Sequence, residues 1–349
     1  KLDKSQTIEL ARKTLIVCAN KFDKTKSNAI NIEQTDNIYT LTYDSSFSAK
    51  LAYAKYSNDS DIVYCEYDTA LETSDVKESN DIRDAMIGSH INETNKNLFE
   101  NINIEENSNT INRDKAMIAV IDSGATGEYK HSYNAFNDTT DVTDTVGHGT
   151  KMIKIIENEL KGYNYEIVPI KVANDNGYAT VSTLIKALNY VSKLNPTVVN
   201  ISLTSTNTKS AQILNEYITK LGFNGTAVIV SAGNNSDNVE NYTPANIEDA
   251  IVVGSCDGSG TIKDFSNRGN TIDYLVTSDS TSEAAAITSG LYAKAFLDNE
   301  IAINVLKNSG KVFLYEKEPN SNEIEQKNYI DIDDDRLCWC WFYHYDSGA

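Results

Sequence analysis

Hydrophobic residues in the second half of the chain gather in short apolar runs, separated by stretches with helical periodicity. Such runs are typical of strands that are buried on both faces of a parallel sheet. They are AMIAVIDSG (116–124), YEIVPIKVA (165–173), PTVVNISL (196–203), TAVIVSAG (226–233) and AIVVGS (250–255). VSTLIKALNYVSKL (181–194) and SAQILNEYITKLG (210–222) repeat apolar residues with the period of a helix. This alternation predicts an α/β fold with a doubly wound, mostly parallel sheet over residues 114–318, with ligands at the carboxyl ends of its strands.

The first 77 residues have a different pattern, which predicts a small α+β domain. Three segments alternate like strands and one has the period of an amphipathic helix. They are KTLIVCA (13–19), NIYTLTY (37–43) and DIVYCEYD (61–68), and the helical FSAKLAYAKYS (47–57). Residues 78–113 are polar, which predicts a linker or an extended arm. Residues 319–349 form an acidic and then aromatic tail that fits no predicted element.

Acidic residues outnumber basic ones by 50 to 31, which gives a formal net charge of −19. This charge repels phosphate backbones and anionic lipids, so nucleic acids and membrane surfaces are poor candidate partners. No apolar run reaches the roughly 18 residues of a membrane-spanning helix. The five cysteines are an odd number, which argues against a disulfide scaffold. Cys18, Cys65 and Cys256 lie in or beside apolar runs, where small core residues are expected.

Three short strings supply the residue types of nucleophilic catalysis. VIDSG places Asp122 at the end of a buried strand, GHGT places His148 between two glycines, and TSEAA places Ser282 before a helix of small residues. A serine hydroxyl needs an adjacent base, usually a histidine whose cation is stabilised by a buried carboxylate. Asp, His and Ser are the residue types that this arrangement requires.

A fourth polar residue, Asn234, follows a predicted strand in the string VSAGNN. Its amide could donate to a developing oxyanion, together with the backbone N–H of Ser282 at a helix N-terminus. Taken singly, each of these residues has a structural explanation. Ser278, Ser280 and Ser289 also compete with Ser282 for the role of nucleophile.

The strings VIDSG, GHGT, NISL, SAGN and TSEAA resemble the aspartate, histidine, substrate-strand, oxyanion and nucleophile motifs of the subtilisin family of serine peptidases (family S8), and they occur in the same order. The resemblance extends from about residue 116 to about residue 297 and implies a subtilisin-like fold and a serine endopeptidase. In that family's mechanism, Asp122 would orient and stabilise the imidazolium and His148 would be the base and then the acid. Ser282 would be the nucleophile and Asn234 the oxyanion donor.

The resemblance also assigns substrate-binding residues. A peptide would pair its backbone between two strand edges and lie beside the SAGN turn. The residues are Ser202, Leu203, Thr204 and Ser205 on one edge, Gly177, Tyr178 and Ala179 on the other, and Ser231, Ala232 and Gly233 in the turn. Thr204 and Ser205 stand where the family has a glycine pair, so we expect a narrowed pocket that prefers small or slender side chains.

Members of this family are made with an N-terminal propeptide that acts as a chaperone and an inhibitor. Residues 1–77 resemble such a propeptide, with the first of its two usual helices missing or shortened between Phe22 and Asn31. The chain would then be a zymogen, and the segment after Asp68 would lie in the cleft as a product-like inhibitor. Self-cleavage is expected between about Asp68 and Arg113. The family also implies a secreted, bacterial protein.

Several positions depart from the family pattern. Ser280 and Ala286 replace a glycine and a proline, and Glu283 stands where a methionine is usual. A carboxylate beside the base favours the charged imidazolium, so we expect lower activity below neutral pH than in a Glu283→Gln variant. The segment from His148 to Tyr165 is too short for the calcium loop of many subtilisins, so no metal ligands and no cofactor are predicted.

Two functions stay open at this point. The first is an endopeptidase for peptide or protein substrates that matures by removing its own N-terminal domain. The alternative is a catalytically impaired pseudoprotease that keeps its propeptide and binds a partner, as the altered surroundings of Ser282 suggest. The narrowed pocket and the short loops favour a dedicated role, such as trimming one leader peptide, over a broad scavenging role.

Overall fold

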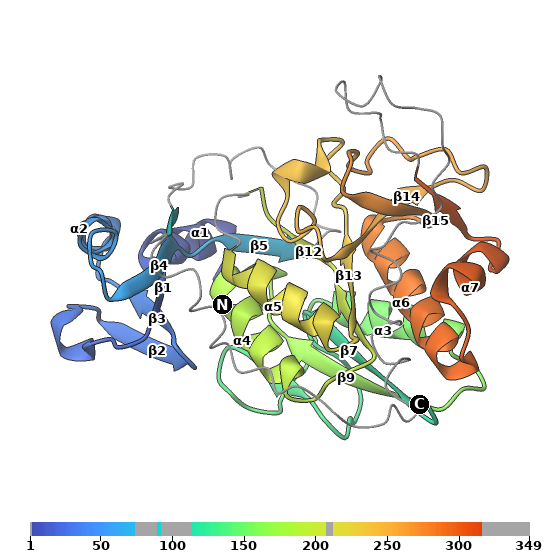
Figure 1. Cartoon of the computed structure of the whole chain (residues 1–349), viewed down its shortest axis with the longest axis horizontal. Helices are drawn as coiled ribbons and strands as arrows, with labels where there is room; N and C mark the ends of the chain where they lie inside the picture. The colour runs from blue at the N-terminus through green and yellow to red at the C-terminus, as the bar shows by residue number, and fades with distance from the viewer. Residues whose placement is uncertain (1, 74–88, 92–112, 207–211, 316–349) are drawn as a thin grey trace, which may run out of the picture.

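The computed structural model describes residues 2–73, 89–91, 113–206 and 212–315, and Figure 1 shows how their elements are arranged. The largest element is an eight-stranded sheet with the order β16-β15-β14-β13-β11-β7-β9-β8. Its strands are β7 (Ala116–Asp122), β8 (Tyr133–Asn134), β9 (Tyr165–Lys171), β11 (Val198–Ile201), β13 (Ala227–Ser231), β14 (Ile251–Cys256), β15 (Ile272–Thr277) and β16 (Val312–Leu314). All neighbouring pairs are parallel except β15 and β16. The predicted doubly wound, mostly parallel sheet is confirmed.

The strand order reverses beside β7. The chain passes from β7 to β9 on one side, then returns to β11 on the other side and continues outwards to β13, β14 and β15. In doubly wound sheets such a reversal leaves a crevice at the carboxyl ends of the strands, where ligands bind. Asp122 is the last residue of β7, so the fold places it at this crevice.

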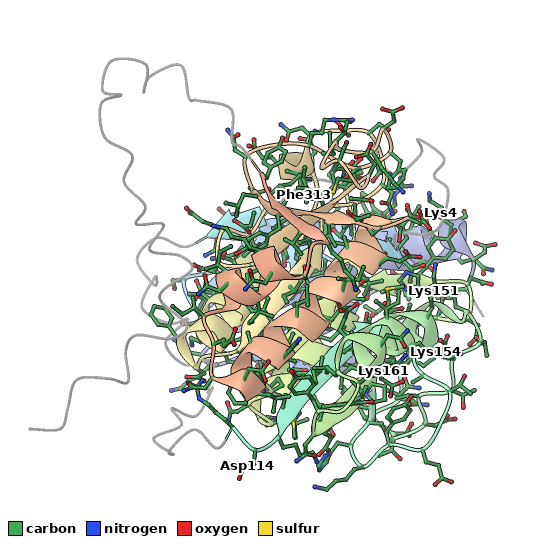
Figure 2. All side chains as sticks on the ribbon, turned by 90° about the vertical axis from the view of Figure 1, so that its right-hand side faces the viewer. Lys4, Asp114, Lys151, Lys154, Lys161 and Phe313 are labelled. Atoms are coloured by element: carbon green, nitrogen blue, oxygen red, sulfur yellow. The ribbon has the colours of Figure 1, made fainter. Side chains whose placement is uncertain are left out.

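Helices cover both faces of the large sheet (Figure 1). On one face, α4 (Val181–Ser192) and α5 (Gln212–Phe223) bury apolar side chains such as Leu188 and Tyr217. On the other face lie α3 (His148–Glu159), α6 (Thr281–Asp298) and α7 (Ala302–Asn308). Figure 2 looks onto α6 and α7, with α3 beside them. Because both faces are covered, most strand residues are apolar instead of alternating with polar ones, with exceptions such as Asp273 in β15.

The N-terminal residues form a second, antiparallel sheet with the order β2-β3-β1-β4-β6. Its strands are β1 (Thr14–Ala19), β2 (Asn31–Thr35), β3 (Ile38–Thr42), β4 (Ile62–Tyr67) and β6 (Ser89–Ile91), and its helices are α1 (Lys4–Arg12) and α2 (Ser46–Tyr56). A 3-10 turn, Lys24–Lys26, lies where a shortened helix was expected. β6 falls inside the predicted linker, where it pairs with β4 and extends the small sheet.

The small sheet packs onto α4 and α5 with one of its faces. Ile16, Cys18 and Tyr64 from this face share a buried apolar cluster with side chains of both helices. On the helix side, Asn189 Nδ2 donates to Asp36 Oδ2 at 2.6 Å. The opposite face of the small sheet packs against α2 and forms a separate, tyrosine-rich core. The N-terminal unit therefore has a core of its own and a docking face for the large unit.

The helix α1 was not predicted from the sequence. Its start is fixed by a capping box, in which Asp3 Oδ1 accepts a hydrogen bond from Gln6 N at 2.8 Å and Gln6 Oε1 accepts one from Asp3 N at 2.9 Å. Asn174 and Asn176 both donate from their side chains to the carbonyl of Leu2 just before this helix. These contacts place α1 against the loop that precedes one edge of the predicted substrate-binding region.

The predictions about cysteines and membrane-spanning helices can be compared with the structure for the described residues. Cys18, Cys65 and Cys256 are buried free thiols, as expected. No helix in the described part of the chain is long and apolar enough to cross a bilayer. The predicted tail, residues 319–349, lies outside the described residues.

Candidate active site

Asp122 and His148 are joined by a buried hydrogen bond. His148 Nδ1 donates to Asp122 Oδ1 at 2.7 Å, and both residues are buried. The carboxylate is held in place because Asp122 Oδ1 also accepts from Ser123 N at 2.7 Å. A proton on Nδ1 leaves Nε2 as the basic nitrogen of the ring. The sequence predicted this pairing, and the fold brings the two residues together from β7 and the start of α3.

The glycines on both sides of His148 allow helix α3 to begin at the histidine, close to the end of β7. Gly147, the N-cap of α3, has φ of +88°, a backbone conformation that favours glycine. A Cβ atom on Gly149 would lie 2.2 Å from the carbonyl oxygen of Gly124 and 3.1 Å from Cβ of Asp122. Helix α3 therefore approaches the end of β7 so closely that only glycine fits at this position.

A second carboxylate, Asp144, orders the turn before His148. Its Oδ1 accepts from Ser123 Oγ at 2.9 Å and from the backbone N–H groups of Val146 and Gly147. Its Oδ2 accepts from Thr150 N at 2.9 Å and Thr150 Oγ1 at 2.7 Å. Burial alone would raise the pKa of Asp144, but these hydrogen bonds hold it below its ordinary value. Sequence reasoning missed this residue.

Ser282 lies in the first turn of α6, directly after Thr281. Ser280 is the N-cap, and its Oγ accepts from Glu283 N at 3.2 Å. Ser282 is fully buried, and among the described residues its Oγ has no hydrogen-bond partner. No hydrogen bond joins this Oγ to His148 Nε2, a contact that often tightens only when substrate binds.

The competing serines are already engaged in hydrogen bonds. Ser278 Oγ donates to the carbonyl of Val276 at 3.0 Å, and Ser289 Oγ donates to Asn200 Oδ1 at 3.0 Å. Ser280 Oγ is used for helix capping. Of these four serines, Ser282 is the one whose hydroxyl has no hydrogen-bond partner among the described residues.

Asn234 is fixed by the residue that precedes Ser282. Its Oδ1 accepts from Thr281 N at 3.0 Å and from Thr281 Oγ1 at 2.9 Å. Since both bonds go to the carbonyl oxygen of the amide, the Nδ2 group is directed away from Thr281. Gly233, with φ of +97°, donates its N–H to Thr281 Oγ1 at 3.1 Å. The predicted donor is thus attached to the turn that carries the predicted nucleophile.

Ser231, Ala232 and Gly233 of the predicted binding turn are buried. Asn267 holds this turn, because its Nδ2 donates to Ala232 O at 2.8 Å and its Oδ1 accepts from Asn235 N at 3.0 Å. Asn267 therefore holds the backbone on both sides of Asn234. Substrate contact by the three residues stays a prediction.

A strand from the N-terminal part of the chain lies between the two predicted substrate edges. β5 (Ala70–Thr73) is the middle strand of a sheet with the order β10-β5-β12 and pairs antiparallel with both neighbours. β10 (Tyr178–Thr180) and β12 (Leu203–Thr204) contain most of the predicted edge residues.

The register of β5 directs its carboxyl end towards Ser282. Glu72 lies opposite both Tyr178 and Thr204, and Thr73 lies opposite Leu203. Ser202, the next residue along that edge, contacts the backbone of Ser282 through a hydrogen bond of 3.5 Å from Ser202 Oγ to the carbonyl. Thr73, the last described residue of β5, therefore lies opposite the neighbour of the residue that contacts Ser282.

Thr204 and Ser205, which are predicted to narrow the pocket, lie at the end of β12 and directly after it. Both residues are buried, and the backbones of Ser205 and Thr243 exchange two hydrogen bonds of 2.9 and 2.8 Å. The effect on side-chain preference stays a prediction. Among the residues that the structure describes, no group of three or more His, Cys, Asp or Glu side chains is placed to hold a metal ion.

Two buried carboxyl groups lie where the N-terminal unit meets α4 and α5. Asp68 accepts from Ser182 N at 3.0 Å and Ser182 Oγ at 2.6 Å, at the start of α4. Burial raises the pKa of Asp68 to about 6 and that of Glu66 to about 8. Glu66 accepts a hydrogen bond from Tyr64 Oη, but its Oε1 has no hydrogen-bond partner among the described residues.

A sequence model of the family described as the subtilase family, Peptidase_S8, matches residues 59–301. Subtilisin-like protease 2 of Pseudogymnoascus destructans is 30% identical over 45% of this chain and 42% of its own length. The Extracellular serine proteinase of a Thermus species is 28% identical over 51% of this chain and 42% of its own length.

Among solved structures, a cold adapted subtilisin-like serine proteinase is 24% identical, with a TM-score of 0.48 over 59% of this chain and 85% of that one. The chain spans less than half the length of the two curated relatives. The family model, in contrast, covers more than half of the chain, from strand β4 to the end of α6. The chain therefore belongs to the subtilase family.

Proposed function

We propose that this protein is a serine endopeptidase in which Asp122, His148 and Ser282 form the catalytic triad and Asn234 is the oxyanion donor. The proposal rests mainly on the 2.7 Å bond from His148 Nδ1 to Asp122 Oδ1, together with an uncommitted Ser282 hydroxyl in the first turn of α6. Family membership supports the same chemistry.

In the proposed mechanism, His148 Nε2 takes the Ser282 hydroxyl proton while Oγ attacks the carbonyl carbon of the scissile peptide bond. Asp122 stabilises the imidazolium that forms. The oxyanion accepts hydrogen bonds from Asn234 Nδ2 and the Ser282 N–H. His148 then protonates the leaving amine, and the C–N bond breaks. A water molecule, deprotonated by His148, hydrolyses the acyl-enzyme and restores the Ser282 hydroxyl.

We further propose that residues 1–77 are a propeptide that inhibits the enzyme until it is cut. The support for this is β5, which occupies the place between β10 and β12 where a substrate backbone would pair. Because the register of β5 leads towards Ser282, we expect self-cleavage within a few residues after Thr73, near the end of this propeptide. Residues 114–318 would then form the catalytic domain.

We also propose that the protein is secreted, which the similarity to a relative named as an extracellular serine proteinase supports. Thr204 and Ser205, which replace the family's glycine pair, support a preference for small or slender side chains before the cleaved bond. Such a preference fits a dedicated processing role better than a broad one.

The test compares the full chain with its Ser282→Ala variant by intact mass over time and by labelling with a fluorophosphonate probe. Ser289→Ala is the control, because Ser289 lies on the same helix but its hydroxyl is bonded to Asn200. We expect cleavage and labelling of the wild type and of Ser289→Ala, and neither for Ser282→Ala.

If all three chains stay whole and unlabelled, including after another protease has removed the N-terminal domain, the pseudoprotease alternative replaces this proposal. The lack of a hydrogen bond between Ser282 Oγ and His148 Nε2 is the observation that favours this alternative.

A further inference from the structure

An ion pair connects the helix of the base to the helix of the nucleophile. Lys151 lies one turn after His148 on α3, and Glu283 directly follows Ser282 on α6. Lys151 Nζ is 2.8 Å from Glu283 Oε1, and the Glu283 side chain is 18% exposed. The contact therefore bridges the two helices at the end where the proposed catalytic residues lie.

The other oxygen of the same carboxylate holds the turn that precedes Ser282. Glu283 Oε2 accepts from Asp279 N at 3.2 Å, while Glu283 N donates to the N-cap, Ser280 Oγ. One side chain thus fixes residues 279–282 on one side and Lys151 on the other. Exposed ion pairs contribute little by themselves, and Lys151 is 51% exposed, so the second attachment of Glu283 to the turn is what distinguishes this pair.

The opposite end of this helix pair is fixed by close packing. A Cβ atom on Gly290 would lie 2.6 Å from Cβ of Glu159 and 3.2 Å from the carbonyl oxygen of Ile156, so α3 and α6 are in tight contact there. Nearer the proposed catalytic residues, the Lys151–Glu283 pair supplies an attraction between the same two helices. Figure 2 labels Lys151 and Lys154 on α3, and Lys161 just beyond the end of this helix.

We propose that the Lys151–Glu283 ion pair is a positioning device that sets the distance between Ser282 Oγ and His148 Nε2. This inference rests on the proposed function. Because no hydrogen bond joins those two atoms in the structure, a small relative shift of α3 and α6 decides whether proton transfer is possible. The pair is partly exposed, so salt weakens it and the reaction slows as ionic strength rises.

The test uses the full chain, allowed to mature, in the wild type and in Lys151→Met, Lys151→Arg and Lys154→Met variants. Lys154 is the matched control, because it is an exposed lysine on the same helix one turn further from His148. We measure the rate of fluorophosphonate labelling, kcat and KM for a peptide substrate at low and high sodium chloride, and the thermal midpoint.

We expect Lys151→Met to lower the labelling rate and kcat by about tenfold, with little change in KM, because a misplaced catalytic group slows the chemical step. Lys151→Arg restores most of the rate, and Lys154→Met behaves as the wild type. Salt slows the wild type more than Lys151→Met. The thermal midpoint of Lys151→Met stays close to that of the wild type.

Equal labelling rates for the wild type and Lys151→Met would overturn the inference and leave the proposed function intact. The inference would also be overturned if Lys151→Arg did not restore the labelling rate. It would be overturned as well if the labelling rate fell in proportion to the thermal midpoint. A wild type that is never labelled would instead remove the proposed function on which the inference rests.

Discussion

At the residue scale, the proposed active site depends on a carboxylate that is not part of the triad. Asp144 binds Ser123, which follows Asp122, and also the backbone of the turn that precedes His148. It therefore connects the two segments that supply the acid and the base. A carboxylate in this position accepts all five hydrogen bonds, whereas an amide would direct its own N–H groups at some of the donors.

We predict that Asp144→Asn lowers kcat by about tenfold to a hundredfold, because the turn that carries His148 loses part of its fixed geometry. Steady-state kinetics on the matured protein checks this. Asp141→Asn is the matched control, since Asp141 is in the same loop and its carboxylate accepts hydrogen bonds from Thr143 of that loop. Equal losses in the two variants would contradict a specific role for Asp144.

Sequence reasoning found Asp122, His148, Ser282 and Asn234 because each stands at the end of an apolar run or in a turn with a distinctive neighbour. Asp144 has no such signal, since the surrounding loop also contains Asp138 and Asp141. Its importance arises only when the fold brings Ser123 within 2.9 Å. The Lys151–Glu283 pair was missed for the same reason, because its two residues are far apart in sequence.

At the element scale, helix α3 lies so close to the end of β7 that the first turn of α3 has no room for a larger residue at position 149. We predict that Gly149→Ala destabilises the protein strongly and abolishes activity, because the added Cβ would lie 2.2 Å from the carbonyl oxygen of Gly124. Thermal unfolding of the Ser282→Ala background measures the loss without interference from self-cleavage.

Gly222→Ala is the matched control for this prediction. Gly222 lies in helix α5, and a Cβ there would meet nothing within 4 Å. Alanine favours a helix by about 0.5–1 kcal/mol over glycine, so this variant should be as stable as the parent or slightly more so. If Gly149→Ala and Gly222→Ala had similar thermal midpoints, the close approach to the Gly124 carbonyl would not determine stability at position 149.

The elements that sequence patterns predicted have a continuous apolar run or a clear helical period. The continuous apolar runs gave β7, β9, β11, β13 and β14, and helical periodicity gave α2, α4 and α5. β15 was missed because Asp273 interrupts its apolar run. That carboxylate accepts from Val252 N at 2.9 Å on the neighbouring strand, a partner that only the tertiary structure reveals.

At the scale of the whole molecule, the N-terminal unit buries two carboxyl groups, Glu66 and Asp68. Burial raises the pKa of Glu66 from 4.5 to about 8 and that of Asp68 from 3.8 to about 6. Each group holds its proton more tightly in the folded chain than in the unfolded chain. Its contribution to stability is therefore complete below about pH 4 and is lost as the pH rises through 6 and then 8.

We predict that Glu66→Gln raises the thermal midpoint at pH 8 and flattens the decline of this midpoint between pH 6 and 9. Glutamine keeps an acceptor for the Tyr64 hydroxyl and carries no charge. Calorimetry on the uncleaved Ser282→Ala chain measures the effect. Glu9→Gln, at a largely exposed carboxylate on α1, should leave the pH dependence unchanged. Parallel pH curves for all three chains would refute the assignment to Glu66.

The central position of β5 has a consequence for the way the protein behaves in solution. β5 satisfies backbone groups of β10 on one side and of β12 on the other. Once it is withdrawn, two strand edges face each other with unpaired N–H and C=O groups, and any extended segment, including one from a neighbouring copy, can add to them. The chain's own strand therefore guards against edge-to-edge aggregation for as long as it stays in place.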